Sequence, residues 1–288
     1  MTSLYLEFGG RRFRTRDEVH DLSIPLRFAD EQLECFGAPP AREQALEAGS
    51  FVGDVRRGGS CNCSTYTLTA HCNGTHTECV GHITAERLSV RELCTELFSV
   101  ALLISVEPVP ASSTSESTTP PPKSGDFLIT RAALETAVRM LDSQLAATEL
   151  SRLELWRAAI AQRALVIRTM PNDASKRLRR YSEQPAPYFS AEAMQWIVTQ
   201  GVEHLVVDLP SLDRAEDEGN LTAHRIFWNV PPSVISIGSD TRRRATVTEL
   251  AYVPDQVVDG LYLLNLQVAP FAADAAPSRP MLTALIPE

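Results

Sequence analysis

A segment of twelve residues, 71–82, carries an unusual density of groups that can bind a metal ion. It contains three histidines, two cysteines and one glutamate around Gly74. Imidazole, thiolate and carboxylate are the protein ligands of zinc and similar ions, and side-chain packing rarely needs so many of them together. The segment therefore predicts a metal site.

The spacing within this segment indicates which side chains can meet. If the chain after Gly74 is extended, His76 and Glu78 point to the same side, because side chains alternate along a strand. Cys72 shares that parity and His71 does not, but a turn at Gly74 would reverse the parity before it. The first ligand is therefore either Cys72 or His71.

Two other interpretations of the segment stay open. In one, the histidines are satisfied by hydrogen bonds within a polar turn. In the other, Cys61, Cys63, Cys72 and Cys79 form a structural zinc–thiolate knot, although the C-x-C spacing is tighter than usual for such sites. The chain has six cysteines and no evident secretory segment, so we expect free thiols or metal ligands rather than disulfides.

Composition limits the class of partner. The 288 residues are 44% hydrophobic and 22% charged, which is typical of a globular protein, and the formal net charge is -9. An acidic chain is a poor match for nucleic acid or an anionic membrane, since both require a basic surface. The longest apolar run, residues 100–104, is far shorter than the ~20 residues of a spanning helix. We expect a small-molecule partner and a cytoplasmic location.

The first part of the chain has the pattern of β-strands. Short apolar or alternating runs rich in β-branched and aromatic residues occur at residues 3–8, 11–14, 64–69 and 99–107. Residues 108–125 are almost all Pro, Ser, Thr, Ala and Glu, and they predict a flexible surface insertion.

Helices alternate with strands in the remainder. An apolar stripe at Leu134, Ala137, Val138, Leu141 and Leu145 predicts a helix that begins near Arg131. Further helices are expected at residues 149–162 and after Ser190, which can cap a helix that ends at Gly201. Further strands are expected at residues 164–168, 202–209, 234–237, 245–252 and 260–268. The pattern predicts one α/β domain of mixed, β-rich architecture over residues 1–288.

Several motifs resemble those of one known family. Residues 74–78 and His82 resemble the H-x-G-T-H-x-D-x-P-x-H signature of the cyclase family, which includes bacterial kynurenine formamidase and isatin hydrolase. Residues 21–26 (DLSIPL) resemble its D-L-S-x-P-L segment, and residues 164–169 (ALVIRT) its A-L-L-I-R-T-G strand. Residues 207–213 with Ala223 and His224 resemble its D-T-P-S-x-D and distal A-H, and residues 248–250 its I-x-E-N-L. The motifs occur in the family's order along nearly the whole chain.

The resemblance implies a single swivelling β/β/α domain, often a homodimer or higher homo-oligomer, with a divalent metal that serves in amide or lactam hydrolysis. Zinc is the first expectation for the metal and manganese the second. The ligands implied by position are His76, Glu78, His224, Glu249 and Cys72 (or His71). The implied acid/base residue is His82, which lies four residues beyond Glu78; imidazole is the side chain whose unperturbed pKa of ~6.5 suits a proton shuttle. An alternative role for His82 is to orient a ligand by a hydrogen bond.

The chain departs from the family pattern at three places. Cys72 stands in the position of the first histidine, and a thiolate would favour zinc and weaken it as a Lewis acid. Glu78 replaces an aspartate, which lengthens that ligand by one methylene group. Val80 and Gly81 replace the proline region, which is a milder change.

Three functional hypotheses follow from this ligand set. The first is a hydrolase of the kynurenine formamidase (arylformamidase) kind, in which metal-activated water attacks the carbonyl of a small amide, formamide or lactam. The second is a family member that has lost efficient catalysis and acts as a binding or scaffold module. The third is a protein with a purely structural zinc site.

Overall fold

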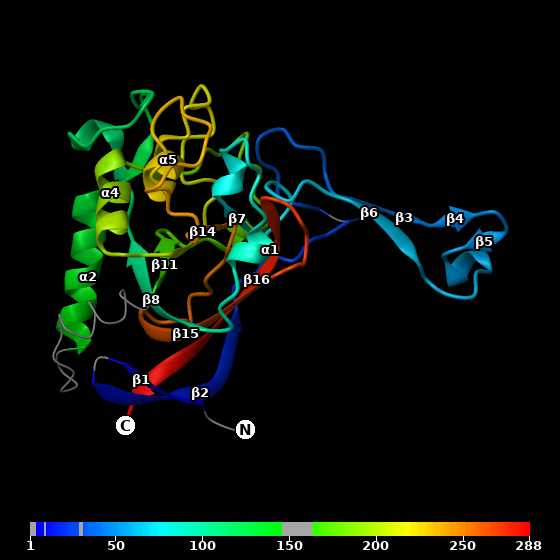
Figure 1. Ribbon diagram of the computed structural model, residues 1–288, viewed down its shortest axis with the longest axis horizontal. Helices are drawn as coiled ribbons and strands as arrows, with labels where there is room; N and C mark the ends of the chain where they lie inside the picture. Colours follow the sequence, from blue (N-terminus) through cyan, green and yellow to red (C-terminus); the bar gives the residue numbers. More distant parts are fainter. Residues whose placement is uncertain (1–3, 9, 29–30, 146–162) are drawn as a thin grey trace.

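Seven strands close into a barrel in the computed structural model, which describes residues 4–8, 10–28, 31–145 and 163–288 (Figure 1). Around the barrel the order is β16 (Ala275–Pro287), β15 (Gly260–Val268), β8 (Ser99–Val106), β11 (Arg163–Thr169), β13 (His204–Val207), β14 (Thr246–Glu249) and β7 (His76–Cys79). The barrel closes because β7 pairs back with β16. The same sheet continues beyond β16 into β2 (Arg11–Asp21) and β1 (Tyr5–Phe8).

Four neighbouring strands of the barrel, β8, β11, β13 and β14, run parallel. The first three are nearly continuous apolar runs, which is the composition of strands that are buried on both faces. Side chains on one face of these strands pack against the helices α2 (Arg131–Leu145), α4 (Ala191–Thr199) and α5 (Thr222–Trp228). Side chains on the opposite face pack with residues of β15 and β16. This double burial makes the four strands a rigid base for the loops at their ends.

A two-stranded arm extends from the body (Figure 1). It consists of β3 (Arg42–Ala45) paired with β6 (Ser64–Thr67), then β4 (Glu47–Ala48) paired with β5 (Phe51–Val52), and the 3₁₀ helix η1 (Val55–Arg57). Most of its side chains are exposed. The arm therefore adds little to the core.

Short elements complete the described chain. They are α1 (Val90–Leu93), the small sheet of β9 (Val109–Pro110), β10 (Phe127–Ile129) and β12 (Tyr188–Phe189), and the 3₁₀ helices η2 (Val80–His82), η3 (Ala111–Ser113) and η5 (Ala174–Arg177). No helix among the described residues is both long enough and apolar enough to cross a membrane.

The segment 108–125 lies against the helices. Glu116 accepts hydrogen bonds from the backbone N–H of Arg131 at the start of α2 and from the hydroxyl of Ser190 before α4. Ser117 donates to Glu192 in the first turn of α4. The flexibility predicted for this segment stays a prediction.

Most of the predicted elements that fall on described residues are present, with one exception. The helix predicted from Arg131 is confirmed as α2, with Leu134, Ala137 and Leu141 buried. Ser190 caps α4 as predicted, because its hydroxyl accepts from the N–H of Ala193. Residues 234–237 were predicted as a strand, which is wrong, because they lie in a loop of turns. The helix predicted for residues 149–162 lies outside the described residues.

Candidate metal centre

The adjoining strands β7 and β14 carry three candidate ligands. His76 and Glu78 are two residues apart on β7, and the antiparallel register places His76 opposite Glu249 of β14. His76 Nε2 lies 3.5 Å from Glu249 Oε2. All three side chains are buried, although a carboxylate or imidazolium without a partner is costly to bury.

Helix α5 supplies a second imidazole. His224 Nε2 lies 3.0 Å from Glu78 Oε1 and 3.4 Å from Glu249 Oε1. On the other side of the ring, His224 Nδ1 lies 2.6 Å from Asp213 Oδ2, and the Asp213 carboxylate also accepts the backbone N–H groups of Ala223 and His224. Because Asp213 accepts the proton on Nδ1, Nε2 is the nitrogen that faces the two glutamates and would be available to a metal ion.

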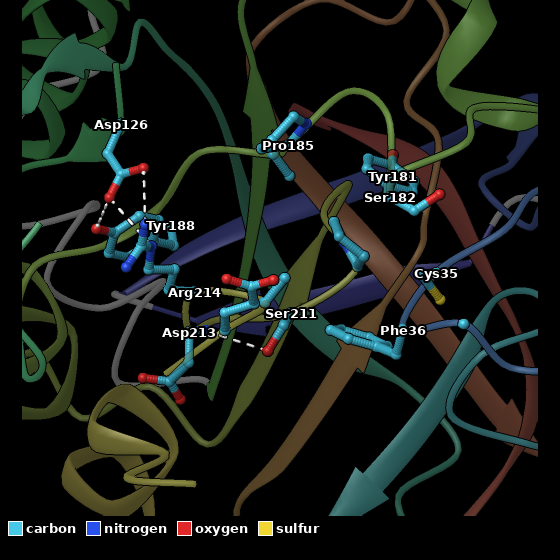
Figure 2. Close-up of a pocket in the computed structure, with 15 residues that line it drawn as sticks. Cys35, Phe36, Asp126, Tyr181, Ser182, Pro185, Tyr188, Ser211, Asp213 and Arg214 are labelled. Carbon is cyan, nitrogen blue, oxygen red and sulfur yellow. Dashed lines mark hydrogen bonds and ion pairs between the residues drawn. The ribbon is translucent and has the colours of Figure 1, made fainter. Parts of the chain in front are cut away.

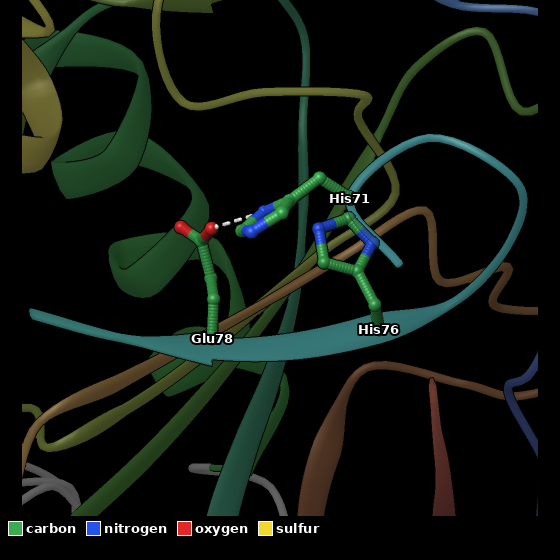
Figure 3. A group of neighbouring side chains, drawn as sticks. All are labelled: His71, His76 and Glu78. Carbon is green, nitrogen blue, oxygen red and sulfur yellow. Dashed lines mark ion pairs between the residues drawn. The ribbon is translucent and has the colours of Figure 1, made fainter. Parts of the chain in front are cut away.

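The turn before β7 supplies a third imidazole. His71 Nδ1 lies 2.9 Å from Glu78 Oε2, and Figure 3 shows this ring reaching over the strand toward the carboxylate. His71 Nε2 lies 2.9 Å from Oδ2 of Asp274, the residue before β16. His76 has the same arrangement, since its Nδ1 bonds the carbonyl of Gly74 at 3.0 Å. Each histidine thus has one nitrogen tied to an acceptor and the other directed inward.

His82 lies at the border of this cluster. It ends η2, a tight turn in which a β-carbon on Gly81 would lie 2.3 Å from the carbonyl oxygen of Leu88. His82 Nδ1 lies 3.7 Å from Asp274 Oδ2 and 3.9 Å from Glu78 Oε2. Its side chain is 28% exposed, so it lies between the buried carboxylate of Glu78, the partly buried carboxylate of Asp274 and the solvent.

The inward atoms lack the partners that buried polar atoms normally have. Among the described residues, His76 Nε2, both carboxylate oxygens of Glu78 and His224 Nε2 are buried without a hydrogen bond of good geometry. Three overlapping groups of ligand atoms each lie within 4.8 Å of one another: His71, His76 and Glu78; His71, His82 and Asp274; Glu78, His224 and Glu249. A divalent cation would satisfy these atoms, so the donor set fits a metal ion.

Charges in the cluster oppose the effect of burial. Burial favours the neutral form of Glu78, but the nearby imidazoles of His82, His224 and His71 outweigh it and hold the pKa of Glu78 well below its usual value. Burial alone would lower the pKa of His71, whereas Asp274 and Glu78 raise it to about 10. The pKa of His224 is raised for the same reason by Asp213, Glu249 and Glu78. The protein alone therefore holds protons where a cation would bind.

Cys72 lies outside all three groups. Its side chain packs in an apolar cluster with Ile24, Leu33 and Cys35. The four thiols proposed as a zinc knot are not gathered either, since Cys61 and Cys63 are exposed on the arm and Cys79 belongs to a different cluster. All six cysteines are free thiols.

A cavity of about 480 Å³ shares part of its wall with the candidate site (Figure 2). Asp213, which holds His224, lines it together with Ser211. Its apolar wall includes Phe36, Tyr181 and Tyr188. A small, partly aromatic molecule would fit a space of this size and lining.

Two residues of the site were missed from the sequence. Asp213 ends the segment 207–213 that resembles a family motif, but no role in the site was predicted for it, and it binds His224. Asp274 gave no signal, because it follows no recognised motif and lies 203 positions from His71. A β-carbon on Gly74 would meet the side chain of Leu26 at 3.1 Å, so this glycine allows close packing against Leu26.

The barrel with a buried histidine–carboxylate cluster defines a class of strand-rich, single-domain proteins with a potential metal centre. The Cyclase family model, described as "Putative cyclase", matches residues 20–214, and the chain belongs to this family. No curated protein matches the chain.

Several solved structures share the fold. Isatin hydrolase A from Labrenzia aggregata bound to benzyl benzoate is 14% identical, with a TM-score of 0.58 and coverage of 93% of each chain. A predicted metal-dependent hydrolase from Bacillus stearothermophilus is 12% identical, with a TM-score of 0.53 and coverage of 92% of this chain and 98% of that one. An isatin hydrolase bound to the product analogue thioisatinate is 13% identical, with a TM-score of 0.54 and coverage of 94% and 93%. These likenesses confirm the predicted mixed, strand-rich single-domain fold.

Proposed function

We propose that the protein is a metal-dependent hydrolase that opens a carbon–nitrogen bond in a small amide, formamide or lactam. The observation that carries the proposal is the set of buried, inward-facing donor atoms on His76, Glu78 and His224 that lack protein hydrogen bonds. Family membership and structural neighbours described as hydrolases support it.

The proposed ligands are His76, Glu78, His224 and Glu249, with His71 rather than Cys72 as the first ligand. The choice of His71 is supported by its inward nitrogen, 2.9 Å from Glu78, and by its hydrogen bond to Asp274. Three imidazoles with carboxylates suit zinc, and manganese is the second candidate. When bound, the divalent ion would lower the pKa of a water molecule and polarise a carbonyl group.

His82 is the proposed acid/base residue. It contacts the edge of the cluster and is partly exposed, so it can exchange a proton with solvent and hand it to the leaving nitrogen. Asp274 lies 3.7 Å from His82 Nδ1 and can hold the ring in place. Asp213 orients His224 on the opposite side of the site.

The cavity lined by Asp213 and Ser211 is the proposed substrate site, and the substrate is a small molecule rather than a nucleic acid or a membrane lipid. We also propose a cytoplasmic location and a homodimer or higher homo-oligomer, both by analogy with the family.

Two alanine variants test this division of roles. His224→Ala should lose the bound metal and hydrolysis together, whereas His82→Ala should keep the metal and lose ~10² to 10⁴ in rate. Elemental analysis of the purified protein and a hydrolysis screen over N-formylkynurenine, isatin and related cyclic amides provide the measurements. Equal metal loss in both variants would refute the assignment of His82. A metal-loaded protein without hydrolysis would favour a binding or structural role.

A further inference from the structure

Two cysteines that have no role in the proposed metal site lie against each other beside it. Cys35 Sγ donates to the carbonyl oxygen of Cys72 at 3.2 Å, and the two side chains belong to one apolar cluster. They come from segments 37 positions apart, and both are buried, with exposed fractions of 1% and 8%. Side-chain contact between two cysteines is the first geometric requirement for a disulfide.

A small molecule can reach this pair through the cavity. Cys35 lines the cavity of about 480 Å³, and Figure 2 shows its sulfur at one side, beside Phe36. Cys72 does not line this cavity, and it is next in sequence to His71. The arrangement therefore has one thiol at a cavity wall and a second thiol in the same apolar cluster, so both partners of a stepwise thiol oxidation are present.

We propose that Cys35 and Cys72 are a reversible oxidation site, at which a small peroxide that enters the cavity converts the pair into a disulfide. In the first step one of the two sulfurs attacks one peroxide oxygen, the O–O bond breaks, and with hydrogen peroxide the products are a sulfenic acid and water. In the second step the other sulfur attacks the sulfenic sulfur and displaces a second water. Two thiols and one hydrogen peroxide thus give one disulfide and two waters, and the two sulfurs together lose two electrons.

The other thiols lie in different surroundings. Cys79 donates to the carbonyl of Leu88 and Cys94 to the carbonyl of Leu266, both away from the cavity. Cys61 and Cys63 are exposed on the arm and could react with any oxidant. They are therefore removed before the test.

The inference rests on the proposed function in one respect, which is that His71 and not Cys72 binds the metal. If Cys72 were a ligand, its thiol would be occupied by the ion and could not serve as the second partner. Metal content therefore has to be measured beside thiol oxidation.

The experiment uses the full chain, loaded with zinc, with Cys61 and Cys63 changed to serine. After one equivalent of hydrogen peroxide, intact mass should fall by about 2 Da, the mass of the two hydrogens lost in disulfide formation. Peptide mapping should join the peptides that contain Cys35 and Cys72, and dithiothreitol should restore the thiols. Cys35→Ser in this background should abolish the mass loss, and the matched control Cys94→Ser should keep it.

Three results would overturn the proposal. One is mass loss that persists in Cys35→Ser, one is a bond mapped to other cysteines, and one is oxygen addition without mass loss. If Cys72→Ser retains zinc, each of these three results overturns the disulfide and leaves the proposed function intact. Loss of zinc in Cys72→Ser would instead contradict the ligand assignment and the disulfide together.

Discussion

The carboxylate of Asp213 offers the sharpest test of how the metal centre is held. It accepts His224 Nδ1 at 2.6 Å and the backbone N–H of Ala223 at 2.7 Å, so one group fixes both the ring and the first turn of α5. In Asp213→Asn the shape is kept, but the negative charge that fixes the proton on Nδ1 is lost. Removal of such an orienting partner typically weakens metal binding about 10- to 100-fold, or roughly 1.4 to 2.7 kcal/mol.

The loss of charge at the helix start also has a cost that does not involve the metal. An anion at the first turn of a helix contributes about 0.3 to 1 kcal/mol. We therefore expect the metal-free Asp213→Asn protein to unfold at slightly lower urea concentration, with a free energy of unfolding reduced by up to about 1 kcal/mol. Metal affinity should fall by more than this.

The assay is competition between the protein and a chromophoric chelator, with urea unfolding of the metal-free form measured in parallel. Asp217→Asn is the matched control, since Asp217 is as buried as Asp213 and accepts the N–H of Leu221 before the same helix without contacting His224. Unchanged metal affinity in Asp213→Asn would refute the reasoning. An equal loss of affinity in both variants would also refute it, because loop order rather than ring orientation would then control binding.

Three further predictions concern the rest of the molecule. Lys176→Met should lower the free energy of unfolding by about 3 to 5 kcal/mol in urea titration, because Asp208, 2.8 Å away, would stay buried without its cation; a change below 1 kcal/mol would contradict this. Gly81→Ala should reduce metal content, since its methyl group would collide with the carbonyl of Leu88 and displace the turn; full metal content by elemental analysis would show that the turn adapts. Since the pKa of His71 is raised to about 10 and that of His224 is also raised in the metal-free protein, metal binding should displace protons from both rings, and apparent affinity should rise at least about tenfold per pH unit between pH 7 and 9; a flat profile in chelator competition would contradict the assignment of both histidines as ligands.

The sequence predicts those parts of the fold whose signals are local. The apolar runs in β8, β11 and β13 identify buried strands, and the apolar stripe of α2 identifies its buried face. These signals are local because buried positions require apolar residues. Strand β16 was not predicted, since Pro277 and Pro280 interrupt its pattern. Proline has no N–H for a ladder hydrogen bond, and it argues against a strand unless the pairing is known.

The same division applies to the candidate site. The alternation of side chains along β7 was sufficient to predict that His76 and Glu78 point to the same side. The structure places these two side chains close to His224 and Glu249. The choice between Cys72 and His71 depended on a turn whose geometry no local pattern specifies. The role of Asp274 could not be predicted, because Asp274 reaches the site only through the pairing of β16 with β7, which are distant in the sequence.

The closing pair of the barrel has a consequence for synthesis. Strand β7 carries His76 and Glu78 early in the chain, but its second neighbour, β16, and Asp274 follow about two hundred residues later. During translation from the amino end, His76 and Glu78 are synthesised before β16, so the sheet is still open beside β7 at that stage. If the cluster binds a divalent ion as proposed, the complete set of ligands and their partner Asp274 can form only after β16 has been synthesised and has paired with β7.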